Sequence, residues 1–162
     1  MSEIPELLER FRRGAEMVAV SITGAAGQEV DFIPEPGKWS IRQIVAHLSD
    51  AEIVGAMRMR RVIAENDPKI EAYDQDAWVN NLDYAKRKPS QSLETFRRIR
   101  TENYELLKDL PEATFERSGT HSENGPMTLK RFLKGYAEHA ENHAAQIRTR
   151  RAEYKAFKAG AK

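Results

Sequence analysis

The sequence has 162 residues, with 26 Lys or Arg, 25 Asp or Glu and no Cys. This length fits a single domain, which we expect to cover residues 1–162 with a core over about 5–154. The lack of Cys excludes thiolate metal ligands, thiol nucleophiles and disulfides from this chain, and the formal net charge of +1 gives no reason to expect a nucleic-acid partner.

Membrane and secretory classes are also disfavoured. No stretch of the sequence approaches the roughly 20 apolar residues that a membrane-spanning helix needs. The first residues lack the basic segment followed by an apolar segment that marks a signal peptide. We therefore predict a cytoplasmic protein without a membrane partner.

Four long segments have apolar residues at the spacing of an amphipathic helix. The first covers about residues 5–24. The second begins at Ser40, where Ser40 and Gln43 have the spacing of a capping box, and it runs to about Asn66. We expect Pro68 to end this helix, because a proline disfavours the helical conformation in the residue before it.

The third and fourth helices lie in the second half of the chain. We predict that the third opens after Pro89, with Ser90 as its capping residue, and runs to Pro111. The fourth is predicted to begin at Thr128 and to continue toward Tyr154.

These segments predict an all-α fold, a four-helix bundle. About 22 residues separate the second helix from the third, which is long for a hairpin between antiparallel helices. A connection of this length can cross back along the bundle and give an up-down-down-up order, in which the second and fourth helices run antiparallel. The brief alternation over residues 28–33 is too short and isolated to favour a strand-based fold.

Three of the four histidines lie where this order would bring them together. His139 and His143 are one turn apart on one face of the fourth helix, and His47 is early in the second. Three neutral imidazoles are a ligand set for a divalent cation that keeps a coordination position open, as catalytic sites do. A lone His on an apolar face is more often a core residue, so the prediction depends on the three rings meeting.

Two polar residues share the faces of these histidines. Asp50 is three residues after His47, and Gln146 is three residues after His143. We predict that they hold the second ring nitrogens or a bound water, with solvated surface residues as the alternative. His121 lies in a segment with turn residues, and we expect a surface loop there rather than a ligand.

The C-terminal segment from Arg148 is rich in positive charge, with Glu153 as its only acid. We expect a frayed, solvated helix end, where cations suit the helix dipole. A phosphate-binding tail, with weak nucleic-acid binding that salt would reverse, is the alternative. The basic residues are Arg148, Arg150, Arg151, Lys155, Lys158 and Lys162.

The sequence resembles the DinB-like superfamily of four-helix-bundle metalloproteins, and within it the YfiT-like metal-dependent hydrolases and bacillithiol transferases. The resemblance covers roughly residues 35–150 and rests on four segments, Lys38–Asp50, Tyr73–Trp78, His121–Leu129 and His139–Ile147. His-Ser-Glu at 121–123 departs from the His-Pro-Glu usual in YfiT-like chains, which leaves the details of that loop open.

The resemblance implies that His47, His139 and His143 bind a divalent metal, with zinc or nickel usual, and that the protein is a homodimer. We predict a metal-dependent enzyme that activates a low-molecular-weight thiol, as an S-transferase, or water, as a hydrolase, toward a small electrophilic substrate. Asp74 and Trp78 would line the mouth of the site, although Trp78 fits a core position equally well. The alternative is a non-catalytic helical binding or assembly module that the metal stabilises.

Overall fold

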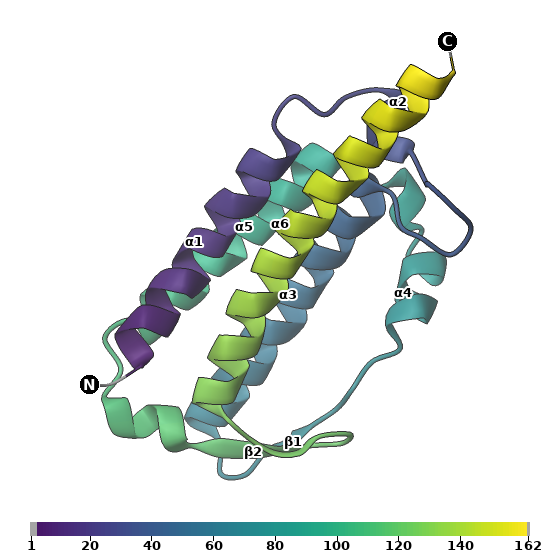
Figure 1. Cartoon of the computed structure of the whole chain (residues 1–162). Helices are drawn as coiled ribbons and strands as arrows, with labels where there is room; N and C mark the ends of the chain where they lie inside the picture. Colours follow the sequence, from purple (N-terminus) through teal and green to yellow (C-terminus); the bar gives the residue numbers. More distant parts are fainter. Residues whose placement is uncertain (1–2, 162) are drawn as a thin grey trace.

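The computed structural model describes residues 3–161, and its core is a bundle of four long helices. The first and last helices run upward in Figure 1, and the two between them run downward, so the predicted up-down-down-up order is confirmed. The four helices are α1 (Ile4–Ile22), α3 (Ile41–Ala64), α5 (Pro89–Leu107) and α6 (Leu129–Gly160).

The long connection from α3 to α5 crosses back along the outside of the bundle, which lets these two helices run parallel (Figure 1). It contains a short strand β1 (Lys69–Ile70), a helix α4 (Gln75–Asn81) and a 3₁₀ turn η1 (Tyr84–Lys86). Helix α3 therefore packs on α5 in parallel and on α6 in antiparallel orientation.

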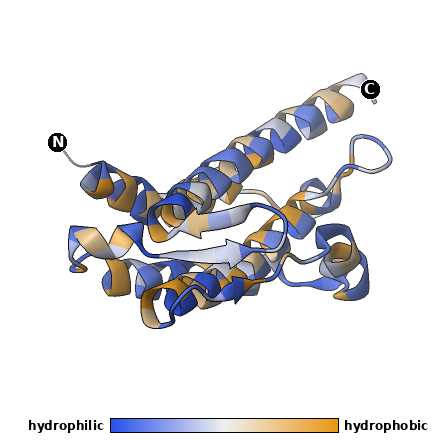
Figure 2. Ribbon diagram, turned by 90° about the horizontal axis from the view of Figure 1, so that it is seen from below, coloured by the Kyte–Doolittle hydropathy of each residue, from blue (hydrophilic) through white to orange (hydrophobic). Residues whose placement is uncertain are grey.

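A small sheet, which the sequence did not predict, closes the lower end of the bundle (Figures 1 and 2). Strand β2 (Ser118–His121) pairs with β1 in parallel and with β3 (Gly125–Thr128) in antiparallel orientation. A second 3₁₀ turn, η2 (Glu112–Glu116), links α5 to this sheet. Strands of two to four residues are too short to show a period in the sequence.

The predicted helix starts are partly confirmed. The capping box at α3 is present, because Gln43 N donates to Ser40 Oγ (3.2 Å) and Ser40 N donates to Gln43 Oε1 (2.9 Å). Thr128 caps α6. The prediction for Ser90 was wrong, because α5 begins at Pro89, whose fixed φ and missing N–H suit the first helical position.

The segment between α1 and α3 and the C-terminal segment also differ from the predictions. Residues 28–31 form a short helix, α2 (Gln28–Asp31), and α6 continues to Gly160 rather than ending near Tyr154. The basic C-terminal segment is not simply a solvated helix end. Arg150 is 4% exposed and its Nε donates to the carbonyl of Trp39 (2.8 Å).

Arg151 has a similar structural role. Its Nε donates to Glu29 (2.8 Å), and its Nη1 donates to the carbonyls of Ser21 (3.1 Å) and Thr23 (2.7 Å). These bonds tie α6 to the end of α1 and to α2, so this arginine is not available to a phosphate-binding tail. Arg148, Lys155 and Lys158 are exposed, and Lys162 lies outside the described residues.

The long helices alternate between hydrophobic and hydrophilic residues along their length (Figure 2). Their apolar faces form one cluster in the lower half of the bundle, around Phe11, Leu107 and Phe132. A second cluster fills the upper half, around Ile44 and Phe96. In residues 3–161, no helix is both long enough and apolar enough to span a membrane.

A buried ion pair separates the two apolar clusters. Arg100 and Glu52 are each 1% exposed and form two hydrogen bonds, Nε to Oε1 (2.8 Å) and Nη2 to Oε2 (2.7 Å). Arg100 also donates to the carbonyls of Phe11 (2.9 Å) and Tyr136 (3.1 Å). The guanidinium needs the space that Gly14 leaves, because a Cβ there would lie 2.9 Å from Arg100 Nη1.

Candidate metal centre

The structure brings His47, His139 and His143 together. His47 comes from α3, and the other two come from α6, which crosses α3 in antiparallel orientation. Nε2 of His139 lies 2.9 Å from Nε2 of His47 and 3.1 Å from Nε2 of His143. Among residues 3–161, this is the one group of three or more His, Cys, Asp or Glu side chains that could hold a metal ion, with ligand atoms within 4.8 Å of one another.

Burial favours the neutral form of all three rings. Burial, together with the neighbouring His143, lowers the pKa of His47 to about 4. Burial and the charges of His143, His47 and Arg100 lower the pKa of His139 to about 2. Burial also lowers the pKa of His143, although its hydrogen bond to Gln146 opposes this. The site therefore presents imidazoles in the form that binds metals.

The protons of these rings cannot satisfy both short contacts. Gln146 Oε1 lies 2.7 Å from His143 Nδ1, so Nδ1 carries the proton and Nε2 of His143 has a free lone pair. If His139 accepts from His47, two lone pairs face each other at His143. If His139 carries the proton on Nε2, that single proton can point along only one of the two contacts, and the other is left without a donor. A cation at the meeting point would satisfy all three nitrogens.

The spacing of the nitrogens fits such a cation. Zinc binds imidazole nitrogens at about 2.0–2.1 Å, which places two ligands of one ion roughly 3 to 3.4 Å apart. The two Nε2–Nε2 distances of 2.9 and 3.1 Å are close to that range. Both the chemistry and the spacing of the donor set are therefore suited to a divalent metal.

Aromatic rings enclose the histidines. The indole of Trp39 packs on the ring of His47, with centroids 5.1 Å apart. The ring of Tyr136 lies 6.4 Å from that of His139. Gly55 makes this position possible, because a Cβ at residue 55 would lie 2.6 Å from Tyr136 Cζ.

A cavity of about 240 Å³ opens beside the histidines. His47 and His139 form part of its wall, and Tyr73, Tyr136, Phe132 and Met127 contribute aromatic and apolar surface. Burial raises the pKa of Tyr73 to about 12 and also raises that of Tyr136, so both phenols keep their protons. The cavity is large enough for a small molecule next to the histidines.

Residues 7–147 match the DinB superfamily. The chain belongs to the DinB superfamily. The predicted family is thus confirmed, and the match includes all three clustered histidines.

Relatives of this DinB protein have been named for metal-dependent activity. A protein of Oceanobacillus iheyensis named "Putative metal-dependent hydrolase" is 30% identical over 121 residues, which cover 74% of this chain and 69% of that protein. YfiT of Bacillus subtilis, also described as a "Putative metal-dependent hydrolase", is 31% identical over 120 residues, which cover 74% of this chain and 67% of YfiT.

The solved structure of B. subtilis YfiT confirms the fold. It matches with a TM-score of 0.88 at 23% identity, over 96% of this chain and 90% of YfiT. That structure is described as "a probable metal-dependent hydrolase with an unusual four-helix bundle topology". The up-down-down-up bundle of the DinB protein described here therefore has a counterpart in a solved structure.

The two candidate residues around the histidines of this DinB protein differ in their partners. Gln146 contacts His143, as described above. Asp50 lies near enough for its charge to raise the pKa of His47, but its Oδ2 accepts hydrogen bonds from Tyr84 Oη (2.8 Å) and Arg87 Nη1 (3.0 Å). The orienting roles of both residues stay predictions.

The surface position predicted for His121 was wrong. The residue is 5% exposed and lies at the end of β2, where the hairpin turns its ring into the cavity wall. Its Nδ1 accepts from the backbone N–H groups of Glu123 (3.2 Å) and Asn124 (3.3 Å). No local pattern indicates this burial, because it depends on pairing between β1 and β2.

The mouth of the site also differs from the prediction. Asp74 caps α4 by accepting from Ala77 N (2.9 Å), and Trp78 packs on the ring of Tyr73, with centroids 4.4 Å apart. Neither lines the cavity, whereas their neighbours Tyr73 and Gln75 do. The segment was identified correctly, but the cavity is lined by different residues within it.

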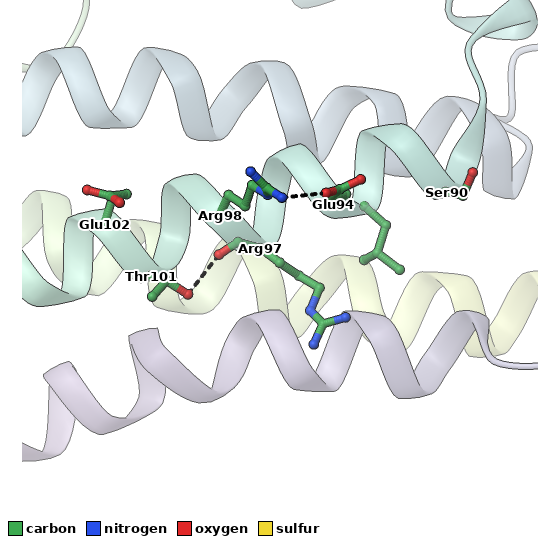
Figure 3. A pocket seen from close by; sticks show the side chains of 7 residues that line it. Ser90, Glu94, Arg97, Arg98, Thr101 and Glu102 are labelled. Carbon is green, nitrogen blue, oxygen red and sulfur yellow. Dashed lines mark hydrogen bonds and ion pairs between the residues drawn. The ribbon is translucent and has the colours of Figure 1, made fainter.

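A larger hollow lies on the exposed side of α5, with a volume of about 580 Å³ (Figure 3). Two of its polar contacts are made within α5, because Arg98 pairs with Glu94 (2.9 Å) and Thr101 Oγ1 donates to the carbonyl of Arg97 (2.9 Å). All of its lining residues come from one helix, and none is a histidine. Size alone therefore does not mark the functional site.

Proposed function

We propose that this DinB protein is a metal-dependent enzyme in which His47, His139 and His143 hold a divalent cation beside the substrate cavity. The observation that carries the proposal is the convergence of three neutral imidazole nitrogens whose own protons cannot satisfy one another. Zinc and nickel are the proposed ions, since both accept imidazole ligands. A cation bound there acts as a Lewis acid and lowers the pKa of a water or thiol beside it.

The surrounding side chains have supporting roles in this proposal. Gln146 fixes the tautomer of His143, so that Nε2 always presents its lone pair. Asp50 acts at one remove, because it holds Tyr84 and Arg87 of the crossover against α3, next to His47. Trp39 covers the ring of His47 and keeps water from that side.

The reaction we propose is attack by water, or by a low-molecular-weight thiol, on a small electrophilic molecule in the cavity. The names of the relatives support hydrolysis. A thiol, if used, must come from a substrate because the chain has no Cys. The cavity beside the histidines favours an enzyme over the alternative of a non-catalytic metal-stabilised module.

Metal analysis of protein purified without an affinity tag tests the ligand assignment. We expect about one divalent ion per chain, and we expect His143→Ala to lose it while the bundle stays helical by circular dichroism. His121→Ala is the matched control, because it removes a buried histidine outside the cluster and should keep the ion. Stoichiometric metal in His143→Ala contradicts the assignment.

A panel of nucleophiles then separates the two reactions. Bacillithiol, mycothiol and glutathione are each tested with an alkylating electrophile, and ester or amide substrates are tested with water alone. Thiol-dependent consumption that His143→Ala abolishes identifies a transferase, and thiol-independent turnover with the same dependence identifies a hydrolase. No turnover in either set, with metal firmly bound, favours the non-catalytic module.

We also propose a homodimer. Ile53 and Met57, one turn apart on α3, are 48% and 61% exposed, which leaves apolar surface that a second copy would cover. Light scattering over a range of concentrations measures the mass directly. A monomer at every concentration contradicts this proposal without affecting the metal site.

A further inference from the structure

Apart from its histidine side, the cavity wall carries hydrogen-bond donors and positive charge. Arg58, His121, Asn124 and Arg131 all line it, and within residues 3–161 no Asp or Glu does. Glu71 and Glu123 are near enough to raise the pKa of His121, but both are exposed and lie outside the lining. The electrostatic environment inside the cavity is therefore positive.

Arg58 is the half-buried cation of this wall, and its charge has no partner there. Its Nη2 donates to the carbonyl of Glu71 (2.7 Å), and its Nη1 lies 3.4 Å from Tyr136 Oη, at the outer limit of a hydrogen bond. Its Nε is buried without a hydrogen-bond partner among the described residues. Among residues 3–161, no carboxylate lies within ion-pair distance of this guanidinium.

Two other arginines, which contact acidic residues of α3, have a counter-charge. Arg100 forms two hydrogen bonds with Glu52, and Arg87 pairs with Asp50 (3.0 Å). A partly buried cation without a counter-charge carries a desolvation cost that an anion would offset. Arg87 and Arg100 are therefore paired with carboxylates of the chain itself, whereas the guanidinium of Arg58 lines the cavity without such a partner.

The position of Arg58 is fixed before any ligand arrives. Its guanidinium lies 5.8 Å from the ring centroid of Tyr73, and its Nη1 also contacts Tyr136 Oη. Tyr136 in turn packs beside His139. This chain of contacts places the cation in the same cavity as the histidines and a short distance from them.

His121 supplies a second fixed donor. Its Nδ1 is occupied as an acceptor by two backbone N–H groups, so the proton of the neutral ring lies on Nε2. Burial, together with the charge of Arg58, lowers the pKa of the ring and keeps it neutral. The residue can donate a hydrogen bond into the cavity, and it cannot act as a base there.

We propose that the cavity selects a small molecule that carries a carboxylate, which Arg58 and His121 bind while its reacting group lies at His47 and His139. A guanidinium and an N–H donor are the groups that recognise a carboxylate oxygen. The reacting end of this inference rests on the proposed function. The carboxylate end rests on Arg58 and His121 alone.

Paired acids and amides test the inference. The first pair is 3-mercaptopropionate and 3-mercaptopropanamide, and the second, without a thiol, is succinamate and succinamide. Binding to chelator-treated protein is followed by NMR, so this test does not depend on a metal. We expect each acid to bind about tenfold or more tightly than its amide, and we expect Arg58→Met to reduce the ratio toward one.

The control variant is Arg98→Gln, which removes an exposed arginine paired with Glu94 on α5 and should keep the preference. A smaller reduction is expected for His121→Ala. Equal binding of acid and amide by the unaltered protein overturns the inference, even if Arg58→Met does not fold. A preference that survives in a folded Arg58→Met protein overturns it as well.

Cobalt-loaded protein separates this inference from the proposed function. If cobalt binds, the cobalt–thiolate absorption should appear at lower concentrations of the mercapto acid than of the mercapto amide. If no metal binds, the proposed function fails, and the metal-free ratios still decide the carboxylate site. A preference in the thiol pair alone assigns the carboxylate to the nucleophile, and a preference in both pairs extends it to the electrophile.

Discussion

Two polar clusters lie inside this bundle, and they are built in opposite ways. In the first, Arg100 meets Glu52, and the remaining guanidinium donors reach backbone carbonyls. In the second, three side chains of the same type, all histidines, meet with their ring nitrogens facing one another. Folding alone accounts for the first cluster, because opposite charges and donors are matched. The second is explained only if something outside the chain joins it.

The comparison predicts different consequences of mutation. Changes in the Arg100 cluster should lower the free energy of unfolding, whether or not metal is present. Changes in the histidine cluster should act through the metal.

The largest effect is expected for Glu52→Ala. Removing the carboxylate leaves the Arg100 guanidinium buried without its counter-charge, which costs about 3–5 kcal/mol in comparable buried pairs. Urea denaturation measures the loss. Glu94→Ala, which breaks an exposed pair on α5, is the control and should change stability little. A Glu52→Ala protein as stable as the control would show that the pair is not needed.

Metal should act on the histidine side of the contrast. At a free concentration of one hundred times Kd, a metal that binds only the folded state raises the free energy of unfolding by about 2.7 kcal/mol. We expect zinc to stabilise the unaltered protein and Glu52→Ala by similar amounts, and not to stabilise His139→Ala. Thermal unfolding with and without zinc provides the measurement. Equal stabilisation of His139→Ala contradicts the contrast.

A tighter fit around the Arg100 cluster should cost less. A Cβ on Gly14 would lie 2.8 Å from Ala140 Cβ and 2.9 Å from Arg100 Nη1, so Gly14→Ala overpacks this point. Overpacking typically costs about 1–3 kcal/mol. Gly135→Ala, where no atom lies within 4 Å, is the matched control on a helix and should be neutral or stabilising. The denaturant midpoint of each variant, compared with that of the unaltered protein, measures these changes in stability.

The smallest effect is expected from the partner of His143. Gln146→Leu removes the acceptor that holds Nδ1 protonated, and such losses usually weaken metal binding by about 10- to 100-fold. Competition with a chromophoric chelator measures the affinity. Stability of the metal-free protein should be nearly unchanged. Unchanged zinc affinity would show that the tautomer of His143 is set in another way.

Much of the fold could be predicted from the sequence because its signals are long or local. The four helices have apolar periodicity over many residues, and the capping box at Ser40 is contained within four residues. The meeting of His47 with His139 followed from the length of the crossover, which fixes the direction of α3 relative to α6. Periodicity and connection length were thus enough to predict the meeting of the histidines as well as the bundle.

The rest depends on contacts between distant residues that periodicity does not encode. His121 is buried only because β2 pairs with β1, some fifty residues earlier in the chain. Arg100 finds Glu52 across the core, although charged residues usually lie at the surface. Arg151 looks like part of a solvated basic run until the end of α1 supplies its acceptors.

The most direct test of the central claim is X-ray absorption at the zinc edge of the zinc-loaded protein. The account predicts three imidazole nitrogens at about 2.0–2.1 Å, and two in His143→Ala where any metal remains. Zinc that binds without imidazole ligands, or with the same imidazole count in the variant, would contradict the claim that these three histidines form the metal centre.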